Sequence, residues 1–216
     1  MDWVSTTDFF TLCWKRARPS LLALLCCLGL AVGWSPAAMA QPAAAELTDF
    51  HLERQEGALY LSATVRLDLP APVEDALVKG IPVHFVVDAE LLRDRWYWYD
   101  RRVAAVARHM RLAYQPLTRR WRLNTSSEPI DAAGLGVSFT QYFDTLAEAL
   151  LALRRISRWK IAEAADMEPG ARHNVDFHFR LDVTQLPRPF QILGVGPSEW
   201  VIAVSRNQRL PVEGGR

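Results

Sequence analysis

The chain has 216 residues, half of them hydrophobic, and a formal net charge of +1 at pH 7. This length is enough to bury a large core without covalent cross-links. The near balance of charge argues against non-specific binding to nucleic acid and against polybasic attachment to a membrane. All three cysteines lie close to the amino terminus: Cys13, Cys26 and Cys27.

The first 40 residues have the features of a signal peptide. A basic segment at residues 15–18 precedes an uncharged run at residues 20–32, and small residues occupy positions 38 and 40. This order is the one that export signals show, with small residues where a signal peptidase cleaves. We therefore predict export of the protein, with cleavage between Ala40 and Gln41.

Retention of this segment as an inner-membrane anchor is the alternative. A helix over residues 20–33 would be about 21 Å long at roughly 1.5 Å per residue, whereas the hydrocarbon core is about 30 Å thick. Cleavage is therefore favoured. It would remove every cysteine, three of the 25 basic residues and two of the 24 acidic residues. The mature chain would then be formally neutral, with no disulfide, thiolate zinc site or cysteine nucleophile.

The remaining residues are predicted to form one domain. Residues 41–47, rich in alanine, are expected to be a flexible leader, residues 48–211 a single β-rich domain, and residues 212–216 a polar tail. Apolar and polar residues alternate around Phe50 and more regularly over residues 59–69. Such alternation predicts antiparallel strands with one buried face.

A short linker helix and a long hairpin are expected next. Pro72 suits the first turn of this helix and Gly80 lies just past its last turn. Alternation within residues 81–114 predicts two long strands, which flank the aromatic and charged run at residues 93–102. Four consecutive large aromatic residues inside this run make it the most unusual stretch of the chain.

The second half of the chain adds strands and one clear helix. A strand over residues 119–124 leads into a polar loop at residues 125–136. Thr145 and Glu148 form a capping box for an amphipathic helix over residues 145–155. Further strands are expected at residues 159–164, 174–181 and 200–204. These patterns predict a mainly β (α+β) fold, an antiparallel two-layer β-sandwich with one amphipathic helix plus a short linker helix.

Several motifs follow one another in a distinctive order. They are Trp96-Tyr97-Trp98-Tyr99-Asp100, the turn at residues 114–118, the helix start at residues 143–146, and residues 179–182 leading to Leu186-Pro187-Arg188-Pro189. Behind a signal sequence, this order resembles the proteobacterial domain of unknown function 4390 family over nearly all of the mature chain. The resemblance implies a periplasmic protein exported by a Gram-negative bacterium. It implies no activity, so no functional residue is carried over.

The sequence offers little catalytic chemistry. It contains no Gly-x-Ser-x-Gly elbow, no His-Glu-x-x-His motif and no phosphate-binding loop. The best local pair is Asp176 with His178, which share the polar face of a predicted strand and could bind a metal if another strand supplied a third ligand. A solvated polar face is the simpler interpretation. We therefore predict no catalytic residue, metal site or cofactor, and keep a metal-dependent or other envelope hydrolase as an alternative.

The aromatic run admits two interpretations. In the structural one, Trp96 and Trp98 point into the core while the two tyrosines lie over a sheet rim. In the functional one, aromatic residues interleaved with arginine form a binding patch, because Tyr, Trp and Arg are enriched at binding hot spots. The candidate binding residues are Arg95, Tyr97, Tyr99 and Arg101.

The leading functional hypothesis is a non-catalytic periplasmic interaction module for an envelope partner. That partner would be a periplasmic or membrane protein or a cell-wall component, and not a nucleic acid. A signal-anchored membrane ectodomain is a further alternative, in which residues 20–32 are retained.

Overall fold

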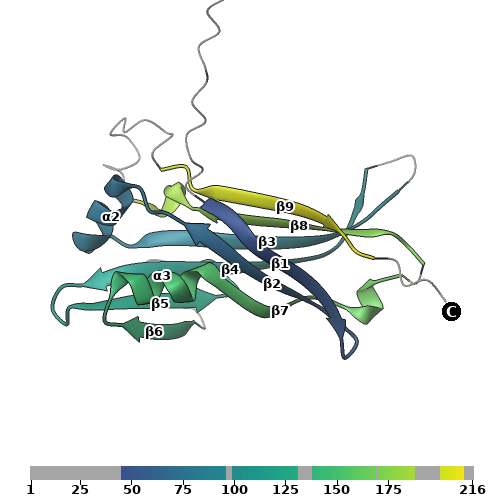
Figure 1. The fold of residues 1–216 in the computed structure, drawn as a ribbon, viewed down its shortest axis with the longest axis horizontal. Coiled ribbons are helices and arrows are strands. Elements are labelled where there is room, and N and C mark those ends of the chain that lie inside the picture. The colour runs from purple at the N-terminus through teal and green to yellow at the C-terminus, as the bar shows by residue number, and fades with distance from the viewer. Residues whose placement is uncertain (1–44, 96–98, 131–137, 169, 188–199, 212–216) are drawn as a thin grey trace, which may run out of the picture. The chain divides into compact units, whose positions relative to one another are not determined.

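The computed structural model describes residues 45–211, except for residues 96–98, 131–137, 169 and 188–199 (Figure 1). The expected signal peptide and the expected polar tail therefore lie outside the described residues. The described elements are β1 (Ala45–Gln55), β2 (Ala58–Leu67), α2 (Ala71–Val78), β3 (Val83–Arg93), β4 (Arg101–Gln115), β5 (Arg120–Ser126), β6 (Phe139–Phe143), α3 (Leu146–Arg154), β7 (Arg155–Glu163), the 3-10 turn η1 (Ala164–Asp166), β8 (His173–Leu181), the 3-10 turn η2 (Val183–Gln185) and β9 (Ala203–Arg209).

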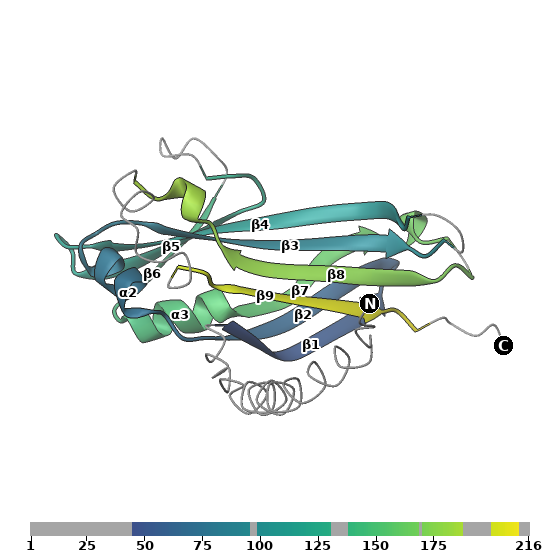
Figure 2. The same cartoon turned by 90° about the horizontal axis from the view of Figure 1, so that it is seen from above.

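The strands form two antiparallel sheets. One has the order β1-β2-β7 and the other the order β6-β5-β4-β3-β8-β9. Figure 2 shows the two sheets as separate layers. The helix α3 follows β6 of the larger sheet, packs against β2, β5 and β6, and leads directly into β7 of the smaller sheet. The expected mainly β (α+β) fold is confirmed.

Alternating side chains place the core between the sheets. In β2, every second residue from Leu59 to Leu67 is buried, whereas Thr64 and Arg66 on the other face are exposed. The strand β8 repeats this pattern and contributes Phe177, whose ring meets that of Phe50 in β1 edge to face at 5.5 Å. Burying large apolar side chains from both sheets supplies the main stabilisation of the fold.

The first hairpin fixes the start of the domain. Glu56 and Gly57 both have positive φ, 52° and 76°, which is the geometry of the two-residue turn that matches the twist of antiparallel strands. The strand β1 begins at Ala45, which is buried and pairs with Leu67. Residues 45–47, expected to end a flexible leader, therefore belong to the sheet, because the partner strand β2 continues far enough to pair with them.

The end of α2 and the start of α3 are capped as the sequence indicates. Past α2, the N–H of Gly80 donates to the carbonyl of Leu77 and the N–H of Ile81 to that of Ala76, and Gly80 takes a φ of 82°. At the start of α3, the N–H of Glu148 donates to Thr145 Oγ1 at 3.2 Å, while Glu148 Oε2 accepts from the N–H of Asp144. These bonds satisfy backbone groups that a helix terminus leaves without partners.

Two differences from the expected elements lie at the edges of the larger sheet. The strand β6 was not expected, and β9 covers Ala203–Arg209 where residues 200–204 were expected. Trp200 and Ile202 are buried but precede the strand. An edge strand needs only backbone pairing on one side, so polar residues such as Ser205 and Arg206 can form it.

Candidate functional site

One end of the β-sandwich gathers the most distinctive surface features. Three segments lie there: the described ends of the β3–β4 connection at residues 94–95 and 99–100, the β1–β2 turn, and residues 164–168 and 170–172 between β7 and β8. Ala58 pairs with Glu163 and Arg93 with His173, which brings these segments together. We call this region the hairpin end.

Polar contacts hold the base of the β3–β4 connection. Arg93 forms an ion pair with Glu168, and the N–H of Asp94 donates to the carbonyl of Arg172 at 3.0 Å. The Asp94 carboxylate accepts from Asn174 Nδ2 at 2.5 Å and lies 3.6 Å from the guanidinium of Arg209. The connection therefore leaves the sheet from a fixed base.

The candidate binding residues lie on this connection or beside it. Arg95, Tyr99 and Arg101 are all exposed, and Tyr99 keeps 89% of its surface accessible. Tyr97 and the two tryptophans Trp96 and Trp98 lie outside the described residues. The three described candidates thus extend into solvent at the end of the long hairpin.

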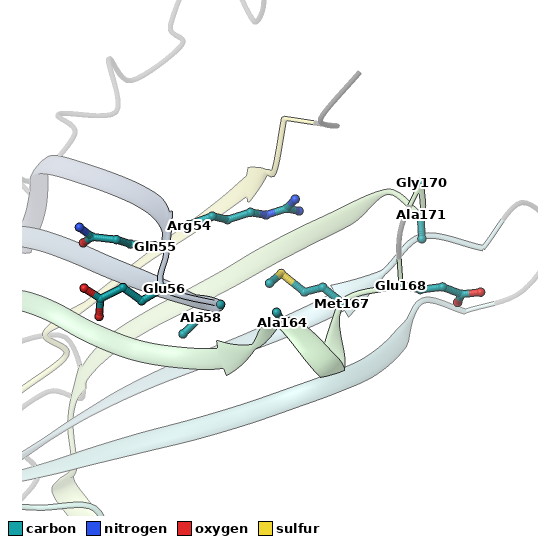
Figure 3. Close-up of a pocket in the computed structure, with 10 residues that line it drawn as sticks. Arg54, Gln55, Glu56, Ala58, Ala164, Met167, Glu168, Gly170 and Ala171 are labelled. Atoms are coloured by element: carbon teal, nitrogen blue, oxygen red, sulfur yellow. The ribbon is translucent and has the colours of Figure 1, made fainter. Parts of the chain in front are cut away.

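A cavity of about 450 Å³ opens beside this base (Figure 3). Its lining comes from the β1–β2 turn and from the segment between β7 and β8: Arg54, Gln55, Glu56, Gly57, Ala58, Ala164, Met167, Glu168, Gly170 and Ala171. Glu168 also pairs with Arg93, so the cavity wall is joined to the β3–β4 hairpin. Sequence analysis missed the cavity because its residues are distant in the chain and form no local motif.

A buried histidine follows the cavity-lining Ala171 by two residues. His173 is only 1% exposed, and neither ring nitrogen makes a hydrogen bond of good geometry within the described residues. Burial is the main cause that lowers the pKa of His173, and the charges of Arg54 and Arg93 lower this pKa further. A contact with the Ala171 backbone acts in the opposite direction. Burial and the two guanidinium charges therefore favour the neutral form of the imidazole.

The expected pair Asp176 and His178 lies on the outer face of the larger sheet. Asp176 accepts a hydrogen bond from Asn207 Nδ2 at 2.5 Å, and His178 is exposed. In the part of the chain that the structure describes, no group of three or more His, Cys, Asp or Glu side chains could hold a metal ion. The third ligand that the pair would need is thus not provided there.

The fold and the hairpin end define a cysteine-free, two-sheet antiparallel β domain with an exposed aromatic and basic tip. Among the described residues, no helix has both the length and the apolar character to cross a membrane. The chain belongs to the family described as Domain of unknown function (DUF4390), whose model matches residues 43–209. This match confirms the family resemblance. Searches of curated proteins and of solved structures found no match.

Proposed function

We propose that this protein is an exported, non-catalytic periplasmic module that binds an envelope partner through the hairpin end. The observation that carries the proposal is the exposure of Tyr99, 89%, between the exposed arginines Arg95 and Arg101. An aromatic ring so far from its own core gains nothing from intramolecular packing. In an interface it would be buried as an anchor, together with arginine.

The fixed base of the connection favours binding. Ordering a loop on association costs free energy, and pre-organisation reduces this cost. The Arg93–Glu168 ion pair and the hydrogen bonds of Asp94 already hold the β3 flank of the connection. The cavity beside them offers a partner side chain a concave site with both a basic and an acidic wall residue, Arg54 and Glu168.

Variants at the two ends of the sandwich test the proposed surface. Tyr99→Ala with Arg101→Ala removes the tip, and Leu117→Ala with Arg66→Ala removes an equally exposed apolar residue and an arginine at the far end. The test uses a strain that lacks the gene and any envelope defect that this deletion causes. We expect the tip variant to accumulate normally yet fail to correct the defect, whereas the far-end variant corrects it. A tip variant that corrects the defect fully would show that this surface is not the binding surface.

Export is tested separately by the intact mass of the protein recovered from the periplasm. A chain that begins at Gln41 supports the cleaved form, whereas a chain that retains residues 20–32 in the membrane supports the signal-anchored ectodomain. The binding surface proposed for the hairpin end is the same in both forms.

A further inference from the structure

A second cluster of polar side chains lies on the outer face of the larger sheet, separate from the hairpin end. Three of its members occupy one row across neighbouring strands, because His84 of β3 pairs with Arg111 of β4, and Arg111 pairs with Asn124 of β5. Arg122 lies two residues before Asn124 and therefore faces the same side. It pairs with Ala113, which lies two residues after Arg111 on β4 and so faces the same side.

Each member of the cluster has a polar atom that is shielded from solvent and has no hydrogen-bond partner within the described residues. These atoms are His84 Nδ1, Arg111 Nε, Arg122 Nε and Asn124 Oδ1. His84 itself is only 9% exposed. Buried polar groups in native proteins are nearly always paired, so four such atoms in one patch call for a partner, which a polar ligand would supply.

The electrostatics of the patch favour an anion. Burial lowers the pKa of Arg111, and the charge of Arg122 lowers it further. The pKa of His84 is lowered to about 4, first by burial and then by Arg111, although Asp182 opposes the shift. The Asp182 carboxylate accepts hydrogen bonds from the N–H and the hydroxyl of Thr184, at 3.0 and 2.6 Å. A bound negative charge would relieve the repulsion between the arginines.

We infer that these four side chains, the outer-face patch, bind a phosphate group, either as inorganic phosphate or as part of a lipid headgroup. Guanidinium groups bind phosphate oxygens through paired N–H donors. Two guanidinium groups therefore suit a doubly charged phosphate better than a singly charged carboxylate. The Nδ2–H of Asn124 and the ring N–H of the neutral His84 imidazole are the further donors for phosphate oxygens. This site does not depend on the function proposed for the hairpin end.

Calorimetric titration of the isolated protein with inorganic phosphate, against acetate at equal ionic strength, tests the free form of the ligand. Arg122→Gln removes one guanidinium of the patch, and Arg122→Lys keeps the charge without the paired donors. Arg102→Gln is the matched control, since Arg102 lies on β4 and pairs with Glu90 outside the patch. We expect saturable phosphate binding that is at least about tenfold weaker in Arg122→Gln and unchanged in Arg102→Gln.

Vesicles that contain phosphatidic acid, compared with phosphatidylcholine vesicles, test the lipid form with the same variants. Arg122-dependent binding to the phosphatidic acid vesicles, without binding of inorganic phosphate, would show that the ligand is a lipid headgroup. The NMR signal of the His84 ring gives a second readout, because a bound dianion should raise its pKa in the wild type and not in Arg122→Gln. Equal binding by the wild type and both Arg122 variants, or no binding in either arm, would overturn the inference.

Discussion

The buried imidazole of His84 should make stability depend on pH in a way that one substitution removes. Its pKa is about 4 in the folded protein, against 6.5 for an unperturbed histidine. Because the folded pKa is depressed, the unfolded chain binds the proton more tightly. His84 should therefore destabilise the fold as the pH falls from about 6.5 towards about 4, and should have little effect above pH 7.

The size of the effect follows from the two pKa values. Between pH 7 and pH 5 the unfolded imidazole becomes almost fully protonated, while the folded one stays largely neutral. This difference corresponds to a loss of about 2 kcal/mol of folding free energy from His84 alone. Since small domains are stable by about 5–15 kcal/mol, a change of this size is readily measured.

Urea unfolding of the wild type and of His84→Gln at pH 7 and pH 5, in chloride buffers free of phosphate, measures this contribution. The wild type should lose about 2 kcal/mol more than His84→Gln over this interval, because other titrating groups are common to both proteins. His178→Gln is the control, since it removes an exposed imidazole from the same sheet face and leaves the buried one in place. Equal losses in the wild type and His84→Gln would refute the assignment of a buried, neutral His84.

Two further predictions concern contacts that stabilise the fold, the cap of α3 and the packing between the two sheets. Thr145→Ala removes the side-chain cap of α3 and should lower the free energy of unfolding by about 1 kcal/mol. Thr145→Ser should keep most of the cap, and chemical denaturation distinguishes the two variants. Phe177→Ala removes a fully buried ring that contacts Phe50 across the two sheets, and should cost about 3–5 kcal/mol in the same assay. A loss below 1 kcal/mol for Phe177→Ala would contradict the packing of the two sheets.

The fold could be predicted wherever one strand face is buried and the other is solvated. In β2 and β8 this contrast produces a regular alternation, and the capping pattern at Thr145 marks the start of α3. The edge strands β6 and β9 give a weaker signal, because much of their surface is polar or exposed and their pairing is made by backbone groups.

The two proposed sites depend on long-range strand pairing, which local sequence patterns do not reveal. Arg111 and Asn124 each look like an ordinary outward-facing residue of an alternating strand, and only the β4–β5 register places them side by side. The cavity at the hairpin end likewise requires the β2–β7 pairing, which brings Ala58 to Glu163. The exposed tip could be singled out from the sequence, because its unusual composition lies within one continuous segment.

In-cell photo-crosslinking at the two ends of β4 is the most direct test of the proposed binding surface. A photo-crosslinking amino acid is placed either at Tyr99, which is 89% exposed before β4, or at Leu117, which is 100% exposed after it. A discrete crosslinked species is expected from position 99 and not from position 117. Crosslinking at position 117 alone, or at neither position, would contradict binding of an envelope partner by the hairpin end.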